Sequence, residues 1–218
     1  MSGAVIIGAG PGIGQAVARR FAREGLAITL IARSDKTLRA GAEAVAATGV
    51  PLLTLTADST DERALRSALD EATDRHGLPD VVVYNAAIVR ADRLGDLSVR
   101  DHLNSWAVNV VGAVLTAAHV LPAMAARGSG TFLITGGMPQ PEPDHVSLSL
   151  SKAGVRALIT LLDTQFGASG VHAASITVPG EVGPTGFDPD EIAEHYWRLH
   201  TQPRPNWDHE IIHAARSH

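Results

Sequence analysis

The sequence predicts a single-domain α/β protein, in which a doubly wound parallel sheet carries helices on both faces. Short β-branched segments alternate with longer segments of helical period, a pattern typical of repeated βα units. Most of the predicted strands are almost entirely apolar, which indicates that helices cover both faces of the sheet. The chain has 218 residues and no internal repeat or Ser/Gly-rich linker, so we expect one domain over residues 1–218.

The order of the elements follows from local patterns along the chain. Apolar β-branched runs predict strands at residues 4–7, 27–32, 52–56, 81–84, 131–135 and 171–178. Segments of helical period between them predict helices at residues 13–24, 36–47, 61–76, 99–127 and 145–168. Near the end of the chain, Asp188 precedes Pro189, and Asp190 and Glu191 follow in the first turn, which predicts a helix over residues 189–200. A last short strand can follow near residues 210–213.

The composition narrows the classes of partner and compartment. Lys and Arg number 18 against 23 Asp and Glu, and a formal charge of -5 repels a phosphate backbone, so no nucleic-acid partner is expected. The absence of Cys excludes disulfides, thiolate catalysis and cysteine-ligated zinc. The N-terminal segment lacks a basic region and a cleavage site, and no run approaches the roughly 18 apolar residues that would span a bilayer. We therefore expect a soluble cytoplasmic protein with no membrane partner.

A glycine-rich loop directly follows the first predicted strand and opens the first helix. It reads Gly8-Ala9-Gly10-Pro11-Gly12-Ile13-Gly14. Without Cβ atoms, such a backbone can turn tightly and approach a pyrophosphate at the helix N-terminus. A tight βα turn without a ligand is the alternative interpretation, but the place of the loop in the first βα unit favours a dinucleotide-binding Rossmann fold.

The end of the second strand predicts which dinucleotide binds. An acidic residue at this place would hydrogen-bond the ribose 2′-hydroxyl and repel a 2′-phosphate. The sequence has Ala32 there, followed by Arg33, whose guanidinium can pair with a phosphate. NADP(H) is therefore favoured over NAD(H), although Arg33 could also be an ordinary surface cation.

Further motifs stand at fixed places after the glycine loop. They are Asp58 and Ser59 after the third strand, Tyr84-Asn85-Ala86-Ala87 after the fourth, Asn109 inside the long helix, and Pro179-Gly180 after the sixth strand. Together with Gly8, Gly12 and Gly14, this arrangement resembles the short-chain dehydrogenase/reductase superfamily from residue 4 to about residue 180.

The resemblance implies roles for individual residues. Asp58 and Ser59 would hold the adenine edge, Asn109 would be the active-site Asn, and Pro179-Gly180 would cover the nicotinamide. The cofactor site that we expect consists of Gly8, Gly10, Gly12, Ile13, Gly14, Arg33, Ser34, Asp58, Ser59, Asn85, Ala86, Lys152, Pro179, Gly180 and Val182. Lys152 and Asn109 are the expected catalytic residues, and no metal is expected.

The chain departs from the family pattern where the family carries its acid/base residues. The family uses a Tyr four residues before the Lys, but Leu148 stands four residues before Lys152. The strand end that usually carries a Ser reads Thr135-Gly136-Gly137, so this Ser is missing unless Thr135 substitutes for it. The segment 181–218 is also a shortened substrate-side segment, in which Pro184 stands where the family has a carboxamide-binding Thr and Thr185 comes one place later.

Three functions remain open. The chain could be an NADP(H)-dependent oxidoreductase that acts on a small carbonyl, alcohol or related substrate with altered acid/base machinery. It could instead be a catalytically silent NADP(H)-binding sensor or partner-binding protein, or a non-redox enzyme on the same fold. Lys152 and Asn109 favour catalysis, whereas the loss of the Tyr and the Ser favours the silent alternative.

Three residues near Leu148 are candidate substitutes for the missing acid. His145 lies on the helix face of Leu148, one turn nearer the N-terminus, although a solvent-facing residue at a helix start is the simpler interpretation. Ser147 and Ser149 flank Leu148 and could orient a substrate, or be ordinary helix residues.

Two further acids are conceivable outside this helix. Tyr84 ends the fourth strand near the nicotinamide side, where it could donate a proton or only pack its ring. Glu181 follows the Pro179-Gly180 loop and would need desolvation to act as an acid, whereas an exposed loop carboxylate is the commoner case.

The tail of the chain carries five of the ten histidines. His209 and His213 have a spacing that suits one face of a helix, but no carboxylate set accompanies them, so a metal site is not expected. Tyr196 and Trp197 are expected to anchor the tail helix on the sheet.

The helices over 99–127 and 145–168 are apolar around most of their circumference. In the family such helices pair with their copies about a two-fold axis. A homodimer or homotetramer is therefore expected.

Overall fold

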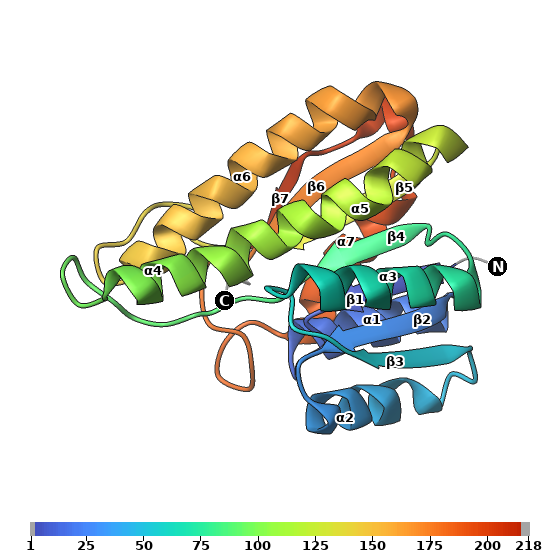
Figure 1. Ribbon diagram of the computed structural model, residues 1–218, viewed down its shortest axis with the longest axis horizontal. Helices are drawn as coiled ribbons and strands as arrows, with labels where there is room; N and C mark the ends of the chain where they lie inside the picture. Colours follow the sequence, from blue (N-terminus) through green and yellow to red (C-terminus); the bar gives the residue numbers. More distant parts are fainter. Residues whose placement is uncertain (1–2, 215–218) are drawn as a thin grey trace.

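Seven parallel strands form the centre of the protein, in the order β3-β2-β1-β4-β5-β6-β7. This computed structural model describes residues 3–214 (Figure 1). The strands are β1 (Gly3–Ile7), β2 (Ala27–Ala32), β3 (Leu52–Thr56), β4 (Val81–Tyr84), β5 (Gly130–Thr135), β6 (Val171–Thr177) and β7 (Glu210–Ile212). The predicted doubly wound parallel sheet is confirmed.

Helices cover both faces of this sheet. They are α1 (Ile13–Arg23), α2 (Asp35–Ala46), α3 (Glu62–His76), α4 (Val99–Trp106), α5 (Gly112–Arg127), α6 (Val146–Phe166) and α7 (Pro189–Thr201). Side chains of β1 alternate between the layers: Ala4 and Ile6 pack with α1, α2 and α7, whereas Val5 and Ile7 pack with α3, α5 and α6. Two apolar cores therefore hold the sheet, one on each face.

The topology sets where a ligand can bind. β1 lies between β2 and β4, so the chain winds outward in opposite directions from this point. In open parallel sheets such a reversal leaves a crevice at the carboxyl ends of the strands. The loops that follow β1, β2, β4 and β5 meet at this edge.

The long helix predicted over residues 99–127 is interrupted by a π-helical segment, η1 (Ala107–Val111). The Tyr84 hydroxyl donates to the carbonyl oxygen of Val108 at 2.5 Å, and the Asn109 side chain bonds the backbone of Ile88. Both contacts hold the segment against the end of β4. A π turn of this kind needs tertiary partners, which periodicity alone does not predict.

The other predicted elements differ from the structure only at their ends. The helix predicted over 145–168 begins at Val146, with His145 as its N-cap residue, and ends at Phe166 before a 3-10 turn, η2 (Gly167–Ser169). The tail helix and the last strand are confirmed, with a 3-10 turn, η3 (Arg204–Asn206), between them.

The helix formed by α4, η1 and α5 is apolar enough to meet the length and composition test for a membrane span. Its most apolar window has a mean hydropathy of 1.7, and 56% of that window is buried inside the fold. In Figure 1 it lies alongside α6 over one face of the sheet. Its hydropathy is that of a helix packed in the core.

Candidate functional site

Two adjoining hollows open at the carboxyl edge of the sheet. The first, which we name the β2 lobe, has a volume of about 580 Å³ and lies against the ends of β1 and β2. The second, the α6 lobe, has a volume of about 690 Å³ and lies against the start of α6 and the loop after β6. Asn85 and Ala87 line both lobes. The two hollows therefore form one elongated cleft that crosses the switch point of the sheet.

The glycine loop forms the floor of this cleft through very close backbone packing. Gly8 has a φ of +87°, and a Cβ on it would lie 2.4 Å from the backbone nitrogen of Ala86. A Cβ on Gly14 would lie 2.4 Å from the carbonyl oxygen of Gly8, so Gly14 packs the helix against the strand and does not line the cleft. Gly10 lines the β2 lobe, and Gly12 and Ile13 line the α6 lobe.

Helix α1 begins at this floor with Ile13 and Gly14, and the next N–H, that of Gln15, donates to the carbonyl oxygen of Gly10 at 3.1 Å. Its N-cap residue is Gly12, so no side chain caps the helix. Uncapped N–H groups at a helix N-terminus favour an anion. The cleft therefore fits a pyrophosphate where the two lobes meet.

The outer end of the β2 lobe carries a positive charge. Arg33 is exposed there, beside Ser34, whose hydroxyl accepts from the Thr37 backbone nitrogen at 3.2 Å and caps α2. Ala32 presents no carboxylate at the end of β2. This end of the cleft fits a phosphate monoester on a ribose.

Asp58 and Ser59 are placed differently from each other. Ser59 is buried and lines the β2 lobe, but Asp58 does not line it. Burial disfavours the Asp58 carboxylate, yet hydrogen bonds from Thr60 and the nearby Arg33 guanidinium outweigh this and lower its pKa. The Asp58 carboxylate therefore orders its own turn next to the lobe.

Asn85 lies at the centre of the cleft with its amide orientation determined by its partners. Its Nδ2 donates to the carbonyl oxygen of Gly8 at 2.8 Å, so its Oδ1 faces the Thr135 hydroxyl, which donates to it at 2.6 Å. A carbonyl oxygen can only accept, which excludes the flipped amide. One N–H of Asn85 is left for a ligand.

The hydroxyl of Thr135 does not substitute for the family Ser. Its single proton goes to Asn85, and the Tyr196 hydroxyl lies 2.6 Å from the same oxygen. Tyr196 must therefore be the donor in that contact. Thr135 lines the α6 lobe, but with this network in place it offers no proton to a substrate carbonyl.

Lys152 reaches the inner wall of the α6 lobe. Its Nζ donates to the carbonyl oxygen of Thr135 at 2.6 Å, and the residue is only 5% exposed. Burial, with a smaller contribution from the Arg156 charge, lowers the pKa of Lys152 to about 8. Leu148, one helical turn earlier, lines the same lobe and contributes an apolar surface.

Sequence reasoning missed a second cation on α6. Arg156 donates from Nη1 to the carbonyl oxygens of Gly137 and Met138, at 3.2 and 3.1 Å. It thereby holds the loop after β5, in which Met138 has a φ of +48°. Its place one turn after Lys152 on the same helix face is the signal that could have identified it.

Asn109 lies outside the cleft. Its side-chain oxygen accepts from the backbone nitrogen of Ile88 at 2.6 Å, and its nitrogen donates to the carbonyl oxygen of Ile88 at 3.1 Å. The residue is buried, and each polar atom of its amide makes one hydrogen bond to the chain that follows β4. In this structure Asn109 positions the wall of the cleft and does not touch its interior.

The helix residues that were candidate acids are tied into the start of α6. The Ser147 hydroxyl donates to the buried carboxylate of Asp92 at 2.7 Å, and its backbone nitrogen donates to the same group. The Ser149 hydroxyl bonds the backbone of Glu142. Ser147 and Ser149 thus order the N-terminus of α6. His145 lies at the mouth of the α6 lobe, with its Nδ1 3.6 Å from a Glu142 oxygen.

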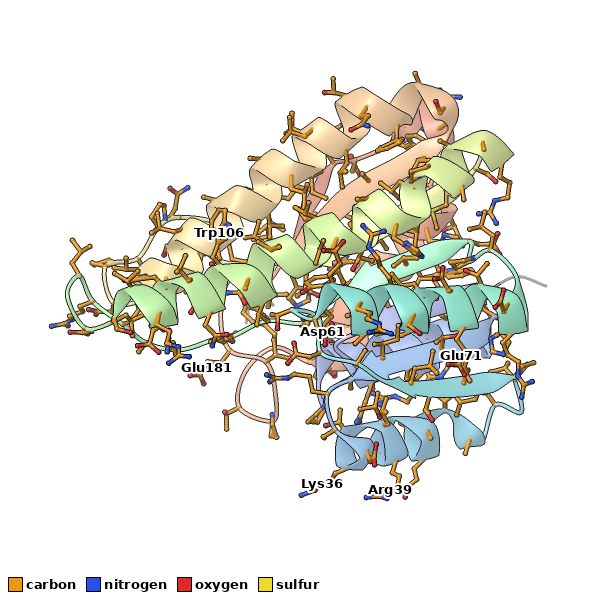
Figure 2. All side chains as sticks on the ribbon, viewed as in Figure 1. Lys36, Arg39, Asp61, Glu71, Trp106 and Glu181 are labelled. Atoms are coloured by element: carbon orange, nitrogen blue, oxygen red, sulfur yellow. The ribbon has the colours of Figure 1, made fainter. Side chains whose placement is uncertain are left out.

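Tyr84 and Glu181 match the simpler of the two interpretations considered for each. The Tyr84 ring is buried, its hydroxyl is bonded to Val108, and burial raises its pKa to about 12. The packing role expected for Tyr84 is confirmed, and the acid role is wrong. Glu181 is exposed and lines the α6 lobe; its side chain is labelled in Figure 2.

The loop after β6 closes one side of the α6 lobe. Pro179, Gly180 and Val182 line it, whereas Thr185 is exposed and does not. Behind it, Phe187 packs edge-on against His213 with ring centroids 5.0 Å apart. The short tail segment is therefore a narrow flap seated on the last strand.

The tail aromatics and histidines are structural in this arrangement. Tyr196 is fully buried, and the Trp197 ring packs on Phe21 of α1, so both anchor α7 as expected. His213 lies 2.9 Å from His195, but His209 faces Asp163 instead. Within residues 3–214, no three His, Cys, Asp or Glu side chains gather as metal ligands would.

Comparison with known proteins agrees with this geometry. A family model described as short chain dehydrogenase matches residues 2–194. The chain is 31% identical over 183 residues to "Oxidoreductase UcpA" of Salmonella typhimurium, which covers 82% of this chain and 68% of that protein. It is 30% identical over 194 residues to "3-dehydrosphinganine reductase TSC10A" of Arabidopsis thaliana, covering 86% and 58%.

Two solved structures share nearly the whole fold. An alcohol dehydrogenase from Thermococcus sibiricus, complexed with 5-hydroxy-NADP, is 28% identical with a TM-score of 0.87, covering 97% of this chain and 95% of that one. A metagenomic short-chain oxidoreductase in complex with NADP is 26% identical with a TM-score of 0.89, covering 97% and 96%. The chain therefore belongs to the short chain dehydrogenase family.

Proposed function

We propose that the protein is an NADP(H)-dependent oxidoreductase that acts on a small carbonyl or alcohol substrate. The observation that carries the proposal is the continuous cleft, which has Arg33 at one end, Lys152 at the other and Asn85 between the two lobes. The uncapped N-terminus of α1 lies along the same path. NADP needs a cation for its 2′-phosphate, a site for its pyrophosphate and an enclosed space for its nicotinamide, in this order.

The choice of NADP(H) over NAD(H) rests on the end of β2. Ala32 leaves room for a 2′-phosphate, and the exposed Arg33 and the Ser34 hydroxyl can bind it. The two family members described above with NADP or its 5-hydroxy derivative support this choice.

When bound, the reduced cofactor supplies a hydride to the carbonyl carbon of the substrate. The residues of this chain hold and enclose the reactants. Lys152 and the Asn85 amide offer N–H groups to the nicotinamide half, and Pro179 and Val182 exclude water from it. Asn109 acts as a positioning residue through Ile88.

The acid/base machinery is altered from the family pattern. Among the described residues that line the α6 lobe there is no Tyr, and the place one turn before Lys152 is filled by Leu148. The glycines after Thr135 offer no hydroxyl. We therefore expect slow turnover of simple ketones relative to cofactor binding.

The α6 lobe favours a small and uncharged substrate. Its lining is mainly apolar or glycine, with Glu142 and Glu181 near its mouth, and the flap over it is short. These carboxylates repel an anionic substrate, whereas a neutral ketone meets no repulsion.

A homodimer or homotetramer in the cytoplasm is part of the same proposal. Exposed apolar side chains gather on the outer helices, with Val99, Leu103 and Trp106 on α4 and Leu150 and Leu161 on α6. Trp106 lies against Gly154 of α6, so α4 and α6 form one surface (Figure 2). Exposed apolar side chains on two packed helices suit a symmetric interface.

Calorimetric titration with NADPH and NADH, followed by assays of neutral ketones such as cyclohexanone with NADPH, tests the function. We expect NADPH to bind and the ketones to be reduced slowly. The catalytically silent sensor would be favoured if NADPH bound but no ketone were reduced and no alcohol were oxidised with NADP.

A further inference from the structure

The α6 lobe contains a buried ammonium without an acidic partner. Across residues 3–214, the hydrogen-bond partner of Lys152 Nζ is the Thr135 carbonyl oxygen, and no carboxylate forms an ion pair with it. An ammonium carries three N–H groups, so two remain for groups that enter the cleft. The ammonium therefore faces the space where a substrate oxygen would lie with its proton-donating capacity unused.

The other titratable groups around this lobe stand farther out. Glu142 and His145 lie at its mouth and face each other at 3.6 Å, and Glu181 is exposed on the flap. Arg156 lies on the far side of the loop after β5, where its guanidinium bonds two backbone carbonyls. Lys152 is the one buried ionisable side chain among the described residues that line the lobe.

We propose that the Lys152 ammonium is itself the proton donor to the substrate oxygen, in place of the phenol whose position Leu148 fills. The proposal rests on the oxidoreductase function argued above. As the hydride forms the new C–H bond, the π electron pair of the carbonyl moves to its oxygen. An N–H bond of Lys152 breaks, an O–H bond of the alcohol forms, and Lys152 is left as a neutral amine that solvent reprotonates.

The physical chemistry of the site suits this step. Burial together with the Arg156 charge brings the pKa of Lys152 to about 8, so the group is mostly protonated at neutral pH and yet releases a proton readily. General acids work best when their pKa lies near the operating pH. The Thr135 carbonyl holds Nζ in place in both protonation states, because an amine still has N–H groups to donate.

The composition of the chain permits a direct measurement of this ionisation. The sequence contains two lysines, Lys36 and Lys152, and Lys36 lies exposed on α2 (Figure 2). Protein labelled with ¹³C-lysine would therefore show two Cε signals, and Lys36→Arg would leave only that of Lys152. We expect the Lys152 signal to titrate near pH 8.

A kinetic experiment compares two substitutions that remove different properties of Lys152. Lys152→Arg keeps a cation and its N–H donors but gives up no proton near neutrality, whereas Lys152→Met loses both functions. With NADPH and cyclohexanone, the wild-type kcat should fall about tenfold per pH unit above pH 8. Lys152→Arg should bind NADPH nearly as well as the wild type, lose about 10²–10⁴-fold in kcat, and show no break near pH 8.

The outcomes separate the proposal from the function on which it rests. Reduction by Lys152→Arg at the wild-type rate and with the wild-type pH break would overturn Lys152 as the donor and leave the oxidoreductase function standing. A Lys152 signal that does not titrate near pH 8 would also overturn it, without any activity measurement. Tight NADPH binding with no ketone reduced by the wild type at any pH would overturn the oxidoreductase function, and the proton transfer with it.

Discussion

The phenol oxygen of Tyr196 lies 2.6 Å from Oγ1 of Thr135, and this contact ties the tail helix to the end of β5. Because Thr135 gives its proton to Asn85, the phenol must donate, and the three side chains form a one-way chain of hydrogen bonds. The chain ends at the Gly8 carbonyl in the glycine loop. The tail helix therefore helps to orient the amide on which both lobes of the cleft depend.

Tyr196→Phe removes the first donor in this chain. We expect the free energy of unfolding to fall by about 0.5–1.5 kcal/mol, the usual net value of one buried hydrogen bond. Urea unfolding would measure it, with Thr135→Val and the double variant completing a cycle. Since the two residues share one bond, their effects should not add, and strict additivity would contradict the shared contact.

Arg33→Ala should weaken NADPH binding and leave NADH binding unchanged. Loss of a charged hydrogen bond to the 2′-phosphate is worth about 1.5–3 kcal/mol, or roughly 10- to 100-fold in Kd. Calorimetric titration of both cofactors measures the difference. Arg39→Ala is the matched control. Arg39 is an exposed arginine on α2, close in sequence to Arg33, and it does not line the β2 lobe (Figure 2). An equal loss for both cofactors would contradict the assignment of Arg33.

Leu148→Tyr should raise ketone reduction, because a phenol one turn from Lys152 would be restored in the lobe. Adding Gly137→Ser should raise it further, since a Cβ there would meet Lys152 Cε at 3.5 Å, an ordinary contact. Gly136→Ser should fail, because its Cβ would lie 2.5 Å from Thr177 Oγ1. Steady-state kinetics measure each variant. Leu148→Phe is the control of equal shape, and a gain there would show that the hydroxyl is irrelevant.

Stability should rise with pH between about 8 and 9.5, because Lys152 titrates at a lower pH in the folded protein than in the unfolded chain. In this window the unfolded state binds more protons, so deprotonation favours the folded state by up to about 1.4 kcal/mol per pH unit. Urea unfolding at both ends of the window measures it. Above this window the buried Tyr84, whose pKa is raised to about 12, opposes the rise. Lys152→Met should abolish the rise, and an unchanged pH dependence in that variant would assign it to another group.

Leu103→Glu with Leu161→Glu should dissociate the expected oligomer, because both side chains are exposed apolar groups on the outer helices. Sedimentation at micromolar concentration measures the mass. Leu94→Glu is the control, since Leu94 is even more exposed but lies in the loop before α4. A wild type that sediments as a monomer would refute the interface.

The fold could be predicted because its signals are local. Each strand is a short apolar run, and the glycine loop has a fixed place after the first of them, so the cleft at the end of β1 follows from sequence order. The departure at Leu148 was also visible, because its spacing from Lys152 is within one helix. These features need no knowledge of how loops pack.

The hydrogen-bond partners within the site could not be predicted in the same way. Asn109 matches a family position, but the two bonds that occupy its amide come from Ile88 in a loop without periodicity. The carboxylate of Asp92 reaches Ser147 across 55 residues, and Tyr196 reaches Thr135 from the tail. Such pairings depend on tertiary packing, which overrides local preference.

The π turn over Ala107–Val111 lets the two parts of the long helix direct their apolar side chains to different sides. One added residue rotates everything after it by about 100° about the helix axis. The turn therefore acts as a phase shift between the apolar stripe that α4 presents outward, at Leu103 and Trp106, and the stripe that α5 buries, at Ala117 and Leu121. If the same residues formed a regular α-helix without the π turn, the two stripes would fall on one side of the helix, and the surface for a partner and the core could not both be satisfied.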